Sequence, residues 1–190
     1  GAQCTFQILP EYMPAPRVKV TVTDDNGAST SEYMDLTIWN DVTAESTTAD
    51  SGITVAYALQ YSSTTPYTIT ATDASAGVTG MELPGYSGQY DSVAVIDFAP
   101  DAQLGSLAAS GVLSQSMTFT VPKSLLNGEG SIWFNQGSMY QLIDDTPEDS
   151  SIDPTKSVFT WDLPANEDTL SAGKFVIFGG ALDLAEAPTV

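Results

Sequence analysis

The sequence predicts an all-β fold, a single-domain antiparallel β-sandwich or flattened barrel of about ten strands that spans residues 1–190. Period-two alternation of apolar residues recurs along the chain, as it does in half-buried strands. Clusters of Gly, Pro, Asn and Ser separate these segments, as turns separate short strands. Because helical periodicity is nearly absent, alternating β-α units are excluded.

The clearest strand is predicted at residues 17–23, where Val18, Val20 and Val22 alternate with polar and basic residues. The Asn26-Gly27 pair ends it, since such a pair readily supplies positive φ. Further strands are predicted at 36–38, 53–61, 67–69, 93–98, 117–121, 132–134, 140–143, 158–163 and 175–178. The last is apolar throughout, so we expect both of its faces to be covered.

Two segments do not follow the strand pattern. Residues 101–110 predict one short helix, with Leu104, Leu107 and Ala108 on one side and an aspartate near its start. Residues 43–52 are rich in Ala, Ser and Thr and are predicted to form a solvated loop. One short helix does not change the fold class.

The charge balance limits the partners. The chain has 24 acidic and five basic residues, a formal charge of −19, which repels phosphate backbones and anionic lipid heads. Nucleic acid is therefore not expected to bind, whereas a neutral polysaccharide, a cation, another protein or a second copy remains compatible. No run approaches the roughly 20 apolar residues that cross a bilayer, so we expect no membrane insertion. The first residue, Gly1, fits signal-peptide removal as well as a purification scar, and we expect an extracellular or cell-surface location.

Histidine is absent and cysteine occurs once, which restricts the chemistry. Without His there is no Ser-His or Cys-His nucleophile and no His-ligated zinc. Cys4 has no second cysteine for an internal disulfide, so a small hydrophobe or an intermolecular cross-link is the expected role. Acid-base or metal chemistry must therefore depend on carboxylates.

The densest group of carboxylates follows a predicted strand and comprises Asp144, Asp145, Glu148, Asp149 and Asp153. Several oxygens in one loop can converge on a hard cation, so this group is the candidate metal site, with calcium as the ion. The spacing is not that of an EF-hand, and a solvated acidic loop is the alternative interpretation. No cofactor is expected to be required.

Aromatic residues give candidate sugar-binding positions, because exposed rings on a β-sheet form stacking platforms. Tyr86 and Tyr90, in the glycine-rich segment 85–90, are the best candidates for exposed contacts, and Trp133 and Trp161 are further candidates. No helix is predicted after this segment, so a phosphate-binding loop is excluded.

The C-terminal third carries a family resemblance. It contains the strand Gly130-Ser131-Ile132-Trp133-Phe134-Asn135, an Asp153-Pro154 loop, and Trp161-Asp162-Leu163, followed by Glu167, Asp183 and Pro188. Glu167 and Asp183 are sixteen positions apart and Pro188 lies five positions further on. This pattern resembles the thaumatin-like β-1,3-glucanases, which release laminari-oligosaccharides, although Glu167 lies six positions after Trp161 where the family has four.

The resemblance implies a secreted thaumatin-like domain that binds a β-1,3-glucan or a similar neutral polysaccharide. It also implies that, if the chain hydrolyses this ligand, it is an inverting glycoside hydrolase with Glu167 as acid and Asp183 as base, about 6.5–9.5 Å apart. The alternative is a structural or adhesive subunit of an extracellular filament, coat or surface layer without enzymatic activity. In that case the apolar stretch 4–9 would pair with the exposed sheet edge of a neighbour.

Overall fold

The computed structural model describes residues 3–9, 17–36, 39–61, 67–102, 112–137, 139–164 and 170–185, and the structural statements below concern these residues. The sequence predicts one domain over 1–190, whereas the contacts between Cα atoms divide the chain into two compact units. Unit 1 comprises Gly1–Asn40 with Ser62–Thr64, and unit 2 comprises Asp41–Tyr61 with Thr65–Val190. Each unit is described by itself.

Unit 1 contains a three-stranded antiparallel sheet in the order β1-β2-β3, formed by Gln3–Leu9, Arg17–Thr23 and Ser29–Asp35. The strand predicted at 17–23 is confirmed as β2. The turn that follows contains Gly27 with φ 84°, and the side chain of Asp24 accepts hydrogen bonds from the amides of Asn26 at 2.9 Å and Ala28 at 2.8 Å. A local turn therefore sets the β2–β3 register.

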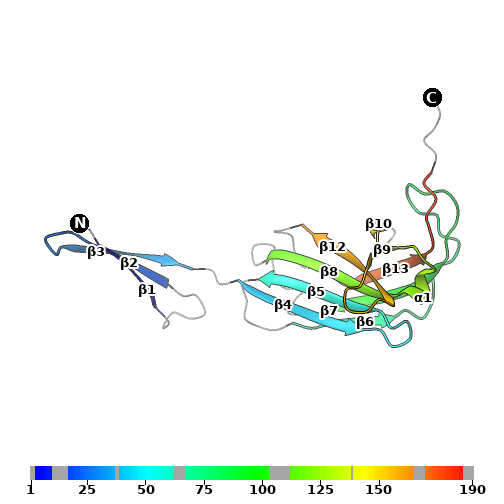
Figure 1. Ribbon diagram of the computed structural model, residues 1–190, viewed down its shortest axis with the longest axis horizontal. Coiled ribbons are helices and arrows are strands. Elements are labelled where there is room, and N and C mark those ends of the chain that lie inside the picture. The colour runs from blue at the N-terminus through cyan, green and yellow to red at the C-terminus, as the bar shows by residue number, and fades with distance from the viewer. Residues whose placement is uncertain are drawn as a thin grey trace, which may run out of the picture. The chain divides into compact units, whose positions relative to one another are not determined.

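Unit 2 is a β-sandwich of two five-stranded antiparallel sheets (Figure 1). The first sheet has the order β10 (Met139–Asp144), β9 (Gly130–Gln136), β13 (Gly173–Gly179), β7 (Ser92–Pro100) and β6 (Ile69–Asp73). The second has the order β11 (Glu148–Asp149), β12 (Lys156–Leu163), β8 (Val112–Pro122), β5 (Thr54–Tyr61) and β4 (Asn40–Thr47). Of the two predicted architectures, the sandwich is confirmed.

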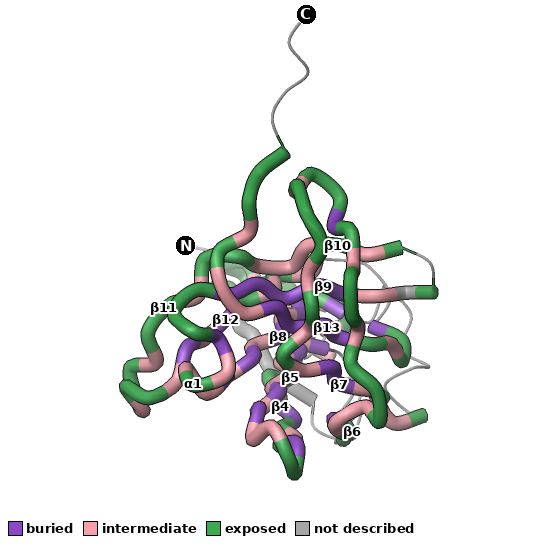
Figure 2. The backbone as a smooth tube through the Cα atoms, turned by 90° about the vertical axis from the view of Figure 1, so that its right-hand side faces the viewer, coloured by how far each residue is buried: buried purple, intermediate pink, exposed green. Residues whose placement is uncertain are grey.

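The main core lies between these two sheets, and Figure 2 shows buried residues on facing strands of both. Strand β5 alternates buried and half-buried residues along its length, as a strand with one covered face does. Between the two sheets, Phe175 of β13 packs against Phe119 of β8, with ring centroids 4.7 Å apart. Aromatic rings from both sheets thus fill the middle of the sandwich.

A second, smaller core lies on the outer face of the first sheet. All four residues 175–178 of β13 are buried, as predicted from their apolar run. Phe175 and Ile177 belong to the main core, whereas Val176 and Phe178 pack with Leu83 in the second cluster. The segment 74–91, which connects β6 and β7, supplies Leu83 and therefore covers this outer face.

In unit 1 the strand β3 was not predicted, and two segments of unit 2 also differ from the sequence prediction. The loop predicted at 43–52 is wrong for its first half, because β4 runs to Thr47 and pairs with β5, whereas 48–52 form the turn between these strands. Of its inward positions Val42, Ala44 and Ser46, the last two are small, so the alternation is weak in the sequence. The predicted helix 101–110 lies largely outside the described residues, and the helix found within them is the four-residue α1, Lys123–Leu126.

Candidate functional site

Tyr86 occupies a segment that the C-terminal chain holds in place. Tyr86 forms an isolated antiparallel bridge with Leu184. The amide of Ser87 donates to the carbonyl of Asp183 at 2.8 Å, and the amide of Ala185 donates to the carbonyl of Gly85 at 3.1 Å. Gly85 and Gly88 flank this pairing with φ 84° and 101°, a backbone conformation that favours glycine. The glycine-rich segment therefore serves a turn that presents Tyr86.

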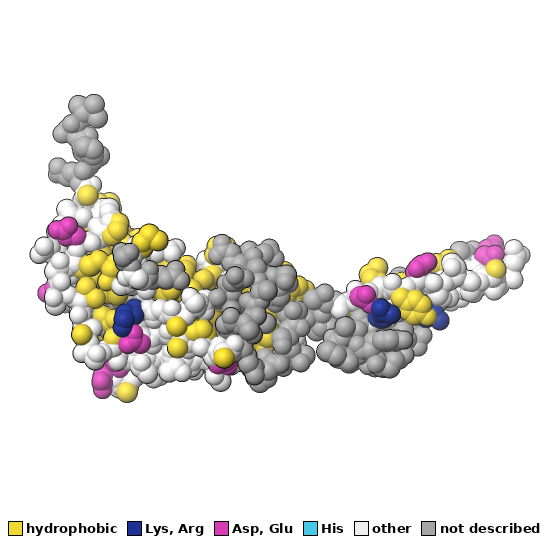
Figure 3. Space-filling model, turned by 180° about the vertical axis from the view of Figure 1, so that it is seen from behind, with side chains coloured by type: hydrophobic (Ala, Val, Ile, Leu, Met, Phe, Trp, Pro, Cys, Tyr) yellow, Lys and Arg dark blue, Asp and Glu magenta, His cyan; other side chains and the backbone are white. Residues whose placement is uncertain are grey.

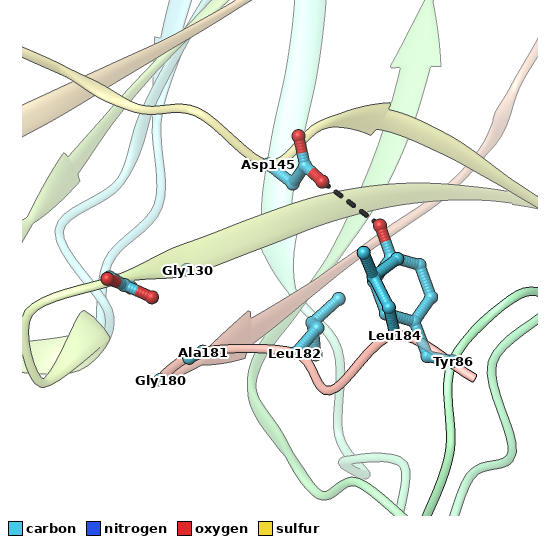
Figure 4. A pocket seen from close by; sticks show the side chains of 8 residues that line it. Tyr86, Gly130, Asp145, Gly180, Ala181, Leu182 and Leu184 are labelled. Atoms are coloured by element: carbon cyan, nitrogen blue, oxygen red, sulfur yellow. Dashed lines mark hydrogen bonds between the residues drawn. The ribbon is translucent and has the colours of Figure 1, made fainter. Parts of the chain in front are cut away.

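The side chain of Tyr86 is fixed at both ends (Figure 4). Its ring meets the ring of Trp133 edge-to-face, with centroids 5.8 Å apart and an interplanar angle of 78°. Its hydroxyl donates to the Oδ2 atom of Asp145 at 3.0 Å. Partial burial and the adjacent Asp145 carboxylate raise the pKa of the Tyr86 phenol, so it stays a neutral donor at physiological pH.

A hollow of about 220 Å³ opens beside this pair. Its lining residues are Tyr86, Glu129, Gly130, Asp145, Gly180, Ala181, Leu182 and Leu184. A second hollow, of about 560 Å³, shares Tyr86 and is otherwise lined by Glu82, Leu83, Pro84, Gly88 and Gln89. The first hollow is smaller than the roughly 300 Å³ at which sites for drug-sized ligands begin, so it fits one unit of a larger ligand.

The first hollow is lined by hydrogen-bond acceptors and by apolar side chains. The carboxylates of Asp145 and Glu129 accept hydrogen bonds, while the exposed side chain of Leu184 offers apolar contact beside the Tyr86 ring. Neither Lys nor Arg is among the lining residues, and Figure 3 shows carboxylates scattered over the face in view. Such a hollow suits a neutral ligand rich in hydroxyl groups.

The other predicted sugar-binding aromatics have structural contacts. Trp133 is only 2% exposed and its Nε1 donates to the Ser131 hydroxyl at 3.0 Å, so it supports Tyr86 from below and offers a ligand no free face. The half-buried ring of Trp161 packs on Phe134, with centroids 5.5 Å apart, in the main core. Trp133 is thus covered in the structure, whereas Trp161 is half-buried, and its role in sugar binding stays a prediction.

Tyr90 also acts mainly within the fold. Its hydroxyl donates to the carbonyl of Ser87 at 2.6 Å and accepts from the amide of Asp183 at 3.0 Å. Its ring meets that of Phe178 edge-to-face, with centroids 6.3 Å apart. Tyr90 thus holds the turn that carries Tyr86, and of the four predicted aromatics Tyr86 lines the hollow.

Of the predicted catalytic pair, Asp183 is exposed beside the hollow, since its neighbours Leu182 and Leu184 line it. Glu167 lies outside the described residues. The proposed acid and base therefore stay a prediction from the resemblance.

Four of the five carboxylates of the predicted metal site have separate partners. Asp144 accepts from the amides of Thr146 and Thr160, each at 2.9 Å, and Asp145 accepts from Tyr86. Asp149 forms an ion pair with Lys123 at 2.6 Å, whereas Asp153 accepts from the amide and hydroxyl of Thr155, which lower the pKa of Asp153. Glu148 is exposed on β11. Within the described ranges, no three His, Cys, Asp or Glu side chains lie close enough to hold a metal ion.

Sequence reasoning did not identify Glu129, Leu182 and Leu184 as site residues, because they come from segments far from Tyr86 in the chain. It did name Asp145, but for a metal site. The only available signal was the acidic run at 144–145, which gives no indication of its tyrosine partner.

No protein-family model, curated protein or solved structure matches the chain. Among the described residues, no helix is long and apolar enough to cross a membrane.

Proposed function

We propose that this protein is a structural or adhesive subunit of an extracellular assembly, and that copies meet through unit 1. The observation that carries this proposal is that no described side chain of unit 1 is buried. Val22, Tyr33 and Met34 are 41%, 56% and 59% exposed. A three-stranded sheet without a buried side chain among its described residues is only marginally stable by itself, so further strands from another copy would stabilise it.

The distribution of charge supports unit 1 as the meeting point. Residues 1–40 contain two of the five basic and five of the 24 acidic residues, a formal charge of −3, which leaves −16 on residues 41–190. Two sandwiches therefore repel each other far more strongly than two copies of unit 1.

Hydrogen exchange of the full chain at two concentrations tests this proposal. In dilute solution the amides of β1 to β3 are expected to exchange quickly, because little packing protects them. At several hundred micromolar, where copies associate, we expect their exchange to slow about tenfold or more. The amides of β13 serve as the internal reference, since the strand is buried within unit 2. A chain that sediments as a monomer at the higher concentration, with unit 1 still unprotected, would contradict the proposal.

The second candidate function is recognition of a neutral polysaccharide at the Tyr86 hollow, and the Tyr86–Asp145 pair is the observation that favours it. Protein sites for sugars combine aromatic surface with fixed polar groups. The hollow offers the Tyr86 ring, Leu184 and two carboxylates. The resemblance to thaumatin-like β-1,3-glucanases makes laminarin the first ligand to test.

Replacing Tyr86 with Ala is expected to weaken laminarin binding at least tenfold, because it removes the ring and the partner of Asp145 together. Calorimetric titration of the full chain measures this. Tyr33→Ala is the matched control, since Tyr33 is an exposed tyrosine of unit 1 and lines neither hollow. Equal affinity of the two variants, or no binding by the unaltered protein at millimolar sugar, would reject this candidate.

A further inference from the structure

Strand β1 is an edge of the unit 1 sheet, because within the described residues it pairs only with β2. Its sequence, Gln-Cys-Thr-Phe-Gln-Ile-Leu, contains no charged residue and no proline. The opposite edge, β3, carries the exposed carboxylates of Glu32 and Asp35, and charged residues on an edge strand oppose pairing with another chain. The two edges therefore differ in their readiness to accept a further strand, and β1 is the open one.

We propose that β1 of one copy pairs antiparallel with β1 of a second copy around a two-fold axis at Phe6. This joins the two unit 1 sheets into one continuous six-stranded sheet. The inference rests on the proposed assembly function and names its partner and register. A two-fold at Phe6 uses all seven residues of β1, whereas any other centre leaves part of the strand unpaired.

The residue pattern of β1 fits pairing with itself. Around Phe6, position 4 stands opposite position 8 of the second copy, and position 5 opposite position 7. The apolar positions 4 and 8 then stand opposite each other, and so do the polar positions 5 and 7. A residue-centred two-fold also keeps corresponding faces of the two sheets on the same side.

One face of the joined sheet is the more apolar. Cys4, Phe6 and Ile8 are in register with Val22, Val20 and Val18 of β2. Pairing at Phe6 therefore extends the row of apolar positions across both copies without a break.

Stacking of this face on the same face of another copy is less favourable than edge pairing. Glu32 of β3 lies in register with Val20, at the middle of the sheet. Face-to-face packing brings two such carboxylates into an apolar contact, where a charge without a partner is strongly unfavourable. Edge pairing leaves Glu32 on an outer strand, and it satisfies the free backbone groups of β1.

Disulfide trapping in the full chain tests the register. In a Cys4→Ser background, Phe6→Cys is expected to give a covalent dimer under mild oxidation, because directly opposed residues of an antiparallel pair lie about 4.5–5.5 Å apart. Ser31→Cys in the same background is the matched control on β3 and is expected to stay monomeric on a non-reducing gel. Unaltered Cys4, which stands opposite Ile8, is expected to cross-link far less than Phe6→Cys.

A charged edge gives the second measurement. Phe6→Lys is expected to weaken self-association at least tenfold in sedimentation experiments, whereas Ser31→Lys, with the same change of charge, is expected to leave it within about twofold. If both variants associate like the unaltered chain and no cross-link forms at position 6, the inference is overturned while the assembly function stands. If the unaltered chain is monomeric at every concentration, both fail.

Discussion

Replacing Phe175 with Ala is expected to lower the free energy of unfolding by about 3–5 kcal/mol, because it empties the centre of the main core. Phe175 is fully buried in β13, the middle strand of its sheet. Its ring lies 4.7 Å from that of Phe119 and 4.9 Å from that of Phe134, measured between centroids. Rings from both sheets lose contact with it at once, so little collapse into the space is expected.

Equilibrium unfolding in urea, followed by tryptophan fluorescence and circular dichroism, measures this loss. Ile152→Ala is the control, since Ile152 is 93% exposed and its truncation is expected to change stability by no more than about 0.5 kcal/mol. A Phe175→Ala midpoint equal to that of Ile152→Ala would show that the sandwich does not depend on this aromatic core.

Unit 2 is expected to lose stability steeply above pH 10. Burial raises the pKa of the Tyr57 phenol to about 12, and burial also raises the pKa of Tyr67. In the unfolded chain these phenols ionise near pH 10. Between pH 10 and 12 the folded state therefore holds more protons than the unfolded state, and stability falls as pH rises. Each buried phenol contributes about 1.4 kcal/mol per pH unit, and below pH 10 the contribution is constant.

The midpoint of urea unfolding at pH 8, 10 and 11 measures this dependence. Tyr57→Phe is expected to make the fall of the unfolding free energy with pH less steep above pH 10, by the contribution of one phenol. It is also expected to cost about 1–3 kcal/mol at pH 8, because the Tyr57 hydroxyl donates to Gln115 at 2.6 Å and accepts from the Leu170 amide at 3.0 Å. Equal midpoints of the unaltered protein at pH 8 and pH 11 would contradict the burial of these phenols.

Local patterns of apolar residues predicted β2 and β13. The alternation of Val18, Val20 and Val22 indicated β2, and the apolar run at 175–178 indicated a strand covered on both faces. The run at 175–178 corresponds to four buried residues, whereas β2 has the apolar alternation although none of its side chains is buried. Strand β4 was not predicted, because Ala44 and Ser46 are too small or too polar to mark its covered face in the sequence. Its pairing with β5 decides its structure.

The candidate site was predicted less completely, because its parts come together only in the folded chain. Tyr86 was recognised from its glycine-rich turn. Asp145 and Leu184, its partners, are brought beside it by β10 and by the C-terminal segment. Trp133 is the opposite case, since a tryptophan in an alternating strand gives no sign of which side is covered. The segment 74–91 covers that side and turns a predicted platform into a buried support.

The all-β class, the charge of −19 and the absence of histidine chemistry follow from the sequence alone, because composition and short-range periodicity express these directly. The folded structure was needed to show that the chain forms two units, one with a core and one whose described residues have none. It also decided that β1 is an edge and that Tyr86 meets Asp145. These properties depend on contacts between distant segments, and no local pattern of residues contains them.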